Sequence, residues 1–242
     1  PLYHVFALTA NLLTFLKWGA RNVLIANPRD IPGLVGELAK VPFTAITGVN
    51  TLFAALLRDP DFKNIDTRAL KLAFGGGMPV QRAVAEQWVA VTGAGLIEGY
   101  GLTEAAPLVA GNPLDSNLYT GTVGLPFPST EICICSESGS ELPLGEVGEV
   151  YVRGPQVMQG YWQKPDETEK VMTADGWLRT GDMGFMDDNG RVKLTDRKKD
   201  MIVVSGFKVF PNEVEEVVVA LDAVLEAAAI GVPDEYSGEA VM

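Results

Sequence analysis

The sequence predicts an α/β fold, in which a parallel sheet with flanking helices is followed by a small distorted β-barrel and the start of a C-terminal α+β domain. Strand-like and helix-like segments alternate over residues 1–117, and short apolar alternations with glycine-rich turns replace them over 118–196. A charged cluster at 196–200 then precedes a new strand and an amphipathic helix. We therefore predict an α/β subdomain (1–117), a β-barrel subdomain (118–196), and a hinge with the truncated start of a small domain (197–242).

In the first part, strands are predicted where a short apolar run stops at a turn-forming residue, at 22–26, 43–47, 70–74 and 96–98. Helices are predicted where apolar residues recur at helical spacing, at 31–40, 50–57 and 80–91. The predicted buried side of the last helix consists of Val80, Val84, Trp88 and Val91. Because strands and helices alternate, the strands are expected to be parallel, with the helices on the faces of the sheet.

Later strands follow from alternating apolar residues at 131–135, 148–153 and 191–195. Asn189-Gly190 predicts a tight hairpin before the last of these. The third part should contain a strand at 201–204, a helix opened by Pro211 with acidic residues in its first turn, and a strand at 224–232.

Composition excludes several classes of protein. The chain has 242 residues, 47% of them hydrophobic, which excludes general disorder. Its net charge of -12 opposes binding to nucleic acid, which requires a basic face. The longest apolar stretch, Val5 to Leu16, contains polar residues and is shorter than the ~20 residues of a membrane span. No charged segment precedes an apolar core, so we expect no signal peptide and a cytoplasmic protein, with Cys133 and Cys135 reduced.

A glycine run follows the predicted strand at 70–74. Gly75-Gly76-Gly77-Met78-Pro79 stands where ligands bind in open parallel sheets, and glycines let a flat ring or a phosphate approach the backbone. The run is neither a G-x-G-x-x-G fingerprint nor a P-loop. The alternative is a plain turn before a helix.

A second candidate segment, Glu98-Gly-Tyr-Gly-Leu-Thr-Glu104, follows the next strand. Tyr100 is suited to stack on a ring, the Thr103 hydroxyl to bind a phosphate oxygen, and Glu104 to hold a hydrated Mg²⁺. The alternative is a tight turn with a capped helix start. Two such loops at adjacent strand ends favour a ligand site.

Asp182 and Arg197 fall on neighbouring predicted strands, where a carboxylate and a guanidinium suit the two hydroxyls of a sugar diol. A surface salt bridge is the alternative. His4 is the only histidine, and no arrangement of nucleophile and base stands out. The pattern therefore favours catalysis by positioning and charge neutralisation, as in phosphoryl or nucleotidyl transfer.

Five segments in order resemble the core motifs of the adenylate-forming enzymes, the group of acyl-CoA synthetases, adenylation domains and luciferases. They are 74–79, 98–104, 154–162, 176–182 and 196–215. Further segments at 1–4, 27–33 and 48–53 are most similar to bacterial long-chain-fatty-acid–CoA ligases. The resemblance covers essentially the whole chain.

The resemblance implies a role for each matching residue. Gly76, Gly77, Glu98, Gly99 and Tyr100 would bind the adenine end of ATP or AMP. Thr103 would bind the α-phosphate and Glu104 the Mg²⁺, while Asp182 and Arg197 would hold the ribose. Lys199 would be a hinge in contact with nucleotide, Ser205 and Gly206 would admit coenzyme A, and His4 would lie near the acyl carboxylate. The helix at 50–57 would form part of the acyl pocket wall.

The implied activity is ATP-dependent conversion of a long-chain fatty acid to acyl-AMP and then acyl-CoA. The family's phosphate loop and catalytic lysine have no match in these residues and are expected upstream and downstream, so residues 1–242 alone are expected to be inactive. Two alternatives stay open: a ligase for medium-chain or aromatic acids, and a non-catalytic module that binds adenine nucleotides. The expected partners are fatty acid, ATP and coenzyme A, with peripheral association at the inner face of the membrane.

Overall fold

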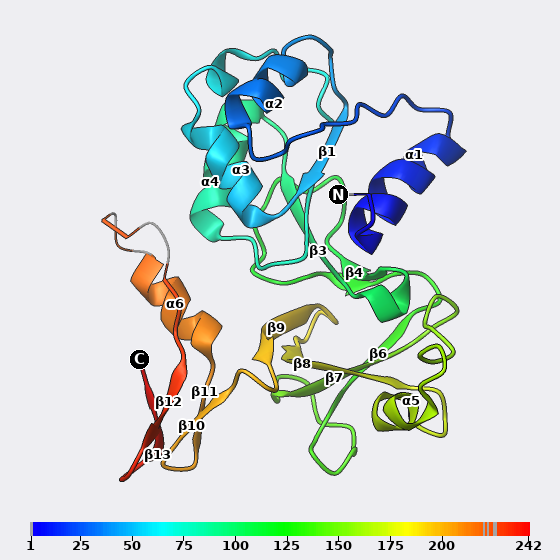
Figure 1. The fold of residues 1–242 in the computed structure, drawn as a ribbon, viewed down its shortest axis with the longest axis vertical. Coiled ribbons are helices and arrows are strands. Elements are labelled where there is room, and N and C mark those ends of the chain that lie inside the picture. Colours follow the sequence, from blue (N-terminus) through cyan, green and yellow to red (C-terminus); the bar gives the residue numbers. More distant parts are fainter. Residues whose placement is uncertain (1, 220, 222, 225–226) are drawn as a thin grey trace. The chain divides into compact units, whose positions relative to one another are not determined.

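The computed structural model describes residues 2–219, 221, 223–224 and 227–242. The chain divides into two units (Figure 1). The first comprises Pro1–Ser129 and Pro155–Met158, and the second comprises Thr130–Gly154 and Gln159–Met242.

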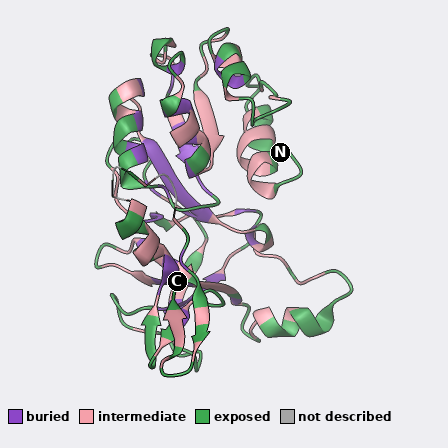
Figure 2. Ribbon diagram, turned by 60° about the vertical axis from the view of Figure 1, so that its left-hand side comes forward, coloured by how far each residue is buried: buried purple, intermediate pink, exposed green. Residues whose placement is uncertain are grey.

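The first unit is built on a five-stranded sheet with the order β1-β2-β3-β4-β5. Its strands are β1 (Ala45–Gly48), β2 (Leu72–Gly75), β3 (Leu96–Gly101), β4 (Leu108–Gly111) and β5 (Leu125–Pro126). The first three strands are parallel, which confirms the predicted α/β class, and the last two extend the sheet in antiparallel fashion. Almost all of β3 is buried (Figure 2).

Three helices surround the core of this unit, α2 (Ile31–Leu38), α3 (Asn50–Arg58) and α4 (Arg82–Thr92). The side chain of Asp30 caps α2 by accepting a hydrogen bond from the Gly33 amide at 3.1 Å. All three helices match predicted ones. Of the four residues expected on the buried side of α4, Val84 and Trp88 are buried, Val91 is partly buried against the core, and Val80 is buried but precedes the helix.

Trp88 of α4 is the centre of this core and is fully buried. Its ring lies 4.9 Å from that of Phe53 in an edge-to-face arrangement and 5.4 Å from that of Phe62 in a stacked one. Phe53 lies on α3 and Phe62 on the short 3₁₀ helix η2 (Phe62–Asn64). Aromatic packing thus joins α3, η2 and α4.

The segment before β1 differs from expectation. A π-helix, η1 (Ala7–Leu13), continues into α1 (Thr14–Lys17), and Asn11 hydrogen-bonds to Thr47 of β1 at 2.7 Å. The predicted strand at 22–26 is wrong, because these residues have no ladder partner within the described part of the chain. An apolar run becomes a strand only where a neighbouring edge can accept its hydrogen bonds.

The second unit contains an antiparallel sheet with the order β6-β7-β8-β9. Its strands are β6 (Glu131–Cys135), β7 (Gly148–Arg153), β8 (Leu178–Met186) and β9 (Val192–Arg197). The hairpin predicted from Asn189-Gly190 is confirmed, since it joins β8 to β9. In the described part of the chain this sheet is open, and the predicted barrel is not closed, because β6 and β9 form its two edges.

A short helix and two cysteines accompany this sheet. Helix α5 (Pro165–Val171) was not predicted, and it precedes β8. Cys133 and Cys135 are both free thiols on the same face of β6, with their Sγ atoms 3.4 Å apart. The two side chains share a face of the strand, as the alternation of strand residues predicted.

A second sheet follows, with the order β11-β10-β13-β12. Its strands are β10 (Ile202–Val204), β11 (Phe207–Val209), β12 (Gly231–Asp234) and β13 (Gly238–Val241), and helix α6 (Pro211–Val219) follows β11. The strand and helix predicted from 201 onward are therefore confirmed.

The strand predicted at 224–232 is only partly present. Residues 225 and 226 lie outside the described residues, and the strand that is described begins at Gly231. Among the described residues, no helix has the length and apolarity needed to span a bilayer.

Candidate functional site

The glycine run of the first unit forms a loop at the C-terminal end of β2. Its first amide, that of Gly76, donates to the carbonyl oxygen of Gly48 at 3.1 Å. A Cβ atom at Gly76 would lie 3.3 Å from the Phe6 ring, and Gly77 has a φ of +78°. Gly77 therefore depends on glycine for its conformation, a side chain at Gly76 would crowd the Phe6 ring, and the loop presents backbone to its surroundings.

Glu98 lies inside this unit, on β3. Its side chain accepts a hydrogen bond from the Val80 amide at 3.0 Å, and the residue is 9% exposed. Burial raises the pKa of this carboxyl group to about 7, although the hydrogen bond from Val80 opposes the shift. The carboxylate is thus engaged with the segment that follows the glycine loop.

Glycines on either side of Tyr100 let β3 pack closely. A Cβ atom at Gly99 would overlap the ring of Phe74, and one at Gly101 would overlap the Pro107 carbonyl. Tyr100 itself is only 7% exposed. The β3–β4 register shifts between Tyr100 and Gly101, so the strand is irregular where the predicted site begins.

Thr103 and Glu104 follow in a single 3₁₀ turn, η3 (Thr103–Ala105). Thr103 is exposed and Glu104 is half-buried. The Glu104 carbonyl accepts a hydrogen bond from the Met158 amide at 2.7 Å, which fixes the backbone of the turn. Within the described ranges, no group of three or more His, Cys, Asp or Glu side chains is arranged to hold a metal ion.

A single carboxylate is nevertheless compatible with Mg²⁺. This ion commonly keeps several waters and is held by one or two carboxylates together with substrate phosphates. Glu104, one residue after a hydroxyl suited to phosphate, fits that donor set.

In the second unit, the structure brings together the predicted carboxylate and guanidinium. Asp182 of β8 and Arg197 of β9 are directly paired in register, and Arg197 Nε lies 3.5 Å from Asp182 Oδ1. The Asp182 side chain is 14% exposed and the Arg197 side chain 64%. A largely buried acceptor beside an exposed donor suits the two hydroxyls of a diol.

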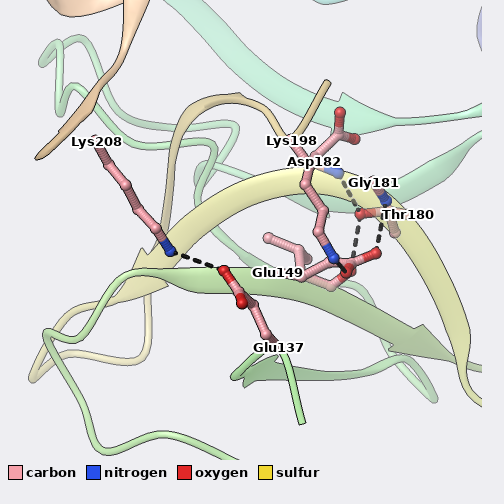
Figure 3. Close-up of polar contacts among 8 residues, drawn as sticks. Glu137, Glu149, Thr180, Gly181, Asp182, Lys198 and Lys208 are labelled. Carbon is pink, nitrogen blue, oxygen red and sulfur yellow. Dashed lines mark hydrogen bonds and ion pairs between the residues drawn. The ribbon is translucent and has the colours of Figure 1, made fainter. Parts of the chain in front are cut away.

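Sequence reasoning missed the supports beneath this pair, which Figure 3 shows. Glu149 of β7, a buried residue, accepts hydrogen bonds from the Gly181 amide at 3.2 Å and from Lys198 Nζ at 2.8 Å. The hydrogen bond to Glu149 raises the pKa of the Lys198 ammonium above its usual value. Glu149 therefore ties together the residues that precede Asp182 and follow Arg197.

A hydroxyl also fixes the backbone of β8 at Asp182. Thr180 Oγ1 accepts from the Asp182 amide at 3.0 Å and donates to the Val150 carbonyl at 2.8 Å. An acidic residue in an otherwise apolar strand was the one signal that pointed to Glu149. The threonine had no sequence signal.

The remaining predicted residues lie on turns. Lys199 is exposed in the turn between β9 and β10. Ser205 and Gly206 form the turn from β10 to β11, with φ values of 49° and 84°. A Cβ atom at Gly206 would meet nothing within 4 Å, so the backbone conformation accounts for this glycine.

His4 is exposed and precedes the N-terminal helix. Its Nδ1 atom accepts a hydrogen bond from the Phe6 amide at 3.2 Å. Phe6 also contacts the site loop, because its ring is the nearest neighbour of Gly76. His4 thus lies two residues from a contact of the glycine loop.

Comparison with known proteins relates this chain to one family. The model of a family described as AMP-binding enzyme matches residues 1–162. A long-chain-fatty-acid–CoA ligase of Yersinia pestis is 60% identical over 241 residues, which is 100% of this chain and 43% of that protein. This chain therefore spans less than half the length of that relative.

Solved structures of related proteins are also similar to this chain. ATP-bound MatB from Rhodopseudomonas palustris matches with a TM-score of 0.88 and 32% identity, over 100% of this chain and 47% of that one. The anthranilate CoA ligase AuaEII in complex with anthranoyl-AMP matches with a TM-score of 0.89 and 29% identity, over 96% of this chain and 45% of that one.

Proposed function

This chain belongs to the AMP-binding enzyme family, and we propose that the protein containing it is a long-chain-fatty-acid–CoA ligase. The observation that carries the proposal is 60% identity along the whole chain to a ligase of that name. A solved relative named for an aromatic acid shares only 29% identity, which favours the fatty acid over the aromatic alternative. The Asp182–Arg197 pair and the glycine loop supply groups suited to a nucleotide.

The proposed reaction has two steps. In the first, a carboxylate oxygen of the fatty acid attacks the α-phosphorus of ATP, and the bond to pyrophosphate breaks to give acyl-AMP. In the second, the thiol of coenzyme A loses its proton and attacks the acyl carbonyl carbon, and AMP leaves. Neither step requires a nucleophile from the protein, in keeping with the absence of such an arrangement among the residues singled out from the sequence.

Adenine is proposed to bind at the loop of the first unit. Gly76 and Gly77 would offer backbone to the ring, with Gly99 and Tyr100 beside them. The limited space around Gly76 supports this role, because a Cβ atom there would lie 3.3 Å from the Phe6 ring and 3.5 Å from the Gly99 carbonyl oxygen. Thr103, which is exposed, would donate from its hydroxyl to an α-phosphate oxygen.

Glu104 is proposed to hold Mg²⁺ together with the phosphates of ATP. The bound ion would neutralise phosphate charge and stabilise the pyrophosphate leaving group. The backbone of Glu104 is fixed by the hydrogen bond from Met158, so its side chain starts from a defined position.

The second unit would supply the ribose contacts. Asp182 would accept from the two hydroxyls and Arg197 would donate to them. Lys199 is proposed as the hinge, since it lies on an exposed turn between two sheets. The turn at Ser205 and Gly206 would lie along the pantetheine arm of coenzyme A, and His4 near the acyl carboxylate.

The test is ATP–pyrophosphate exchange by the full-length protein with carboxylic acids of graded chain length and with benzoate. We expect exchange that is strongest with long-chain acids. Exchange with benzoate alone would identify an aromatic-acid ligase. No exchange with any acid, together with measurable ATP binding, would identify a non-catalytic nucleotide-binding module.

We also propose that the protein works in the cytoplasm and associates peripherally with the inner face of the membrane, because long-chain acids partition into bilayers. Co-sedimentation of the full-length protein with phospholipid vesicles, with and without a long-chain acid, tests this. Failure to sediment in either condition would contradict it.

A further inference from the structure

Two buried polar side chains accept hydrogen bonds from consecutive backbone amides directly after the glycine loop. Glu98 of β3 accepts from the Val80 amide at 3.0 Å, and Asn50 of α3 accepts from the Gln81 amide at 3.0 Å. Glu98 is 9% exposed and Asn50 is 6% exposed. Their positions along the chain differ widely, yet both act on the same two-residue segment.

That segment cannot satisfy its amides by itself. Gln81 is the residue that precedes α4, and no side chain in the segment caps the helix. The first amides of a helix lack partners within the helix and must find acceptors elsewhere. Asn50 is the acceptor for the amide of Gln81, the N-cap residue, and Glu98 is the acceptor for the buried amide of Val80, one residue earlier.

The opposite end of the loop is also fixed. The Gly76 amide donates to the Gly48 carbonyl, and a Cβ atom at Gly75 would lie 2.6 Å from Val80 Cγ2. Residues 76–79 thus connect β2 to Val80 and Gln81, whose amides are each bound by a side-chain acceptor. The path of the loop depends on where Val80 and Gln81 are held.

We propose that Asn50 and Glu98 are positioning residues, which set the path of residues 76–79 and thereby the affinity for the adenine nucleotide. The inference rests on the proposed function, because it takes this loop as the adenine site. It changes the role of Glu98 from a direct nucleotide contact to a support that acts through Val80. It also adds Asn50, which no motif singled out.

Removing either acceptor should weaken nucleotide binding more than it slows the reaction. A buried amide without a partner is costly, and a shift of the loop toward water relieves that cost. We expect about 3- to 10-fold weaker ATP binding for loss of one acceptor, the range that corresponds to a single hydrogen bond. The rate at saturating ATP should change much less, because neither residue is proposed to touch the phosphates.

The experiment compares variants of the full-length protein. Asn50→Leu and Glu98→Met remove the acceptors at similar size, and Glu98→Gln restores an acceptor oxygen. Thr92→Val is the matched control, since Thr92 is a buried residue whose hydroxyl donates within α4 to Trp88, away from the loop. If only one of the two positioning residues gives a folded variant, that variant is enough for the test. Asn50→Ala is a second variant that also removes the acceptor at Asn50.

Three measurements decide the outcome: the Kd for ATP by calorimetry, KM for ATP against kcat in pyrophosphate exchange, and hydrogen–deuterium exchange of residues 76–81. We expect a raised Kd and KM, a nearly unchanged kcat, and faster amide exchange in Asn50→Leu and Glu98→Met. Glu98→Gln should recover most of the lost affinity, and Thr92→Val should leave the Kd unchanged.

Unchanged ATP affinity in folded Asn50→Leu and Glu98→Met would overturn the inference, as would equal weakening by Thr92→Val. These outcomes are distinct from failure of the proposed function, in which the unmodified protein would give no exchange with any acid. In that case the amide-exchange measurement still decides whether the two side chains hold the loop.

Discussion

Asp182 and Arg197 face each other across β8 and β9, with Arg197 Nε 3.5 Å from Asp182 Oδ1. The hairpin joins the two strands, and a bulge between Met183 and Gly184 shifts the register so that Asp182 lies opposite Arg197. The distance is longer than that of a strong bidentate pair, so both groups keep capacity for other partners. A ribose with two adjacent hydroxyls is the partner that we propose.

Replacing Asp182 by alanine should raise KM for ATP by roughly 10- to 100-fold, because hydrogen bonds to a charged acceptor are among the stronger ones. The kcat at saturating ATP should fall much less, since Asp182 is proposed to hold ribose only. Pyrophosphate exchange by the full-length protein measures both constants.

The matched control for Asp182→Ala is Glu131→Ala. Glu131 pairs with Arg153 at 2.7 Å across β6 and β7 of the same sheet, but both side chains are substantially exposed. Such surface pairs contribute little, so KM for ATP should not change. A similar rise in KM in both variants would show that the effect comes from the sheet and not from a nucleotide contact.

Replacing Glu104 by glutamine should reduce pyrophosphate exchange by about 100-fold or more, because one-carboxylate Mg²⁺ sites depend on the charge of that carboxylate. Excess Mg²⁺ should restore part of the activity. Glu86→Gln is the control, since Glu86 lies on the exposed face of α4 in an ion pair with Arg82. Full activity of Glu104→Gln at low Mg²⁺ would rule out the proposed metal contact.

Glu149 should matter more to stability than Glu137, although each binds a lysine (Figure 3). Glu149 is buried and also accepts from the Gly181 amide, whereas Glu137 is exposed. Urea unfolding should show a loss of about 1–3 kcal/mol for Glu149→Gln, the cost of a weakened buried charged bond. Glu137→Gln should cost about 0.5 kcal/mol or less. Equal losses would mean that burial does not distinguish the two pairs.

The Lys198–Glu149 bond also predicts a dependence on alkaline pH. Because the pKa of Lys198 is higher in the folded chain than its usual 10.5, its contribution is complete below that value. The contribution is lost as pH rises through the folded-state pKa. Lys198→Met should therefore remove part of the alkaline loss of stability, measured by urea unfolding at a series of alkaline pH values.

Glu98 should make the first unit less stable as pH rises through a defined window. Its pKa is about 7 in the folded chain against an ordinary 4.5. Between these values the unfolded chain has released the proton and the folded chain has retained it, so the free energy of unfolding falls as pH rises. Above about pH 7 the loss is complete, at roughly 3 kcal/mol as an upper bound.

Glu98→Gln removes this ionisation and keeps an acceptor for Val80. Relative to the unmodified chain, the variant should be more stable at about pH 8 than at about pH 5, measured by urea unfolding at each pH. An identical difference between the two proteins at both pH values would show that Glu98 does not titrate in this window. Glu86→Gln provides a control for an exposed carboxylate.

Much of the fold could be predicted because its signals are local. The Asn189-Gly190 turn predicted a hairpin, and in the structure that hairpin and a bulge after Met183 together place Asp182 opposite Arg197. Helical spacing in α4 placed Trp88 in the core. Two expectations depended on distant partners and were not met: the strand at 22–26 has no neighbour to pair with, and the sheet of the second unit does not close.

The candidate site divides in the same way. The amino-acid sequence by itself indicated the glycine loop, the carboxylates and the two residues Asp182 and Arg197, because backbone conformation and charge depend on short segments. Only the tertiary structure decided what holds them: Glu149 reaches Lys198 across 49 positions, and Asn50 reaches Gln81 across 31. Such bonds depend on burial and on which elements pack together, and neither is set by the residues of one segment alone.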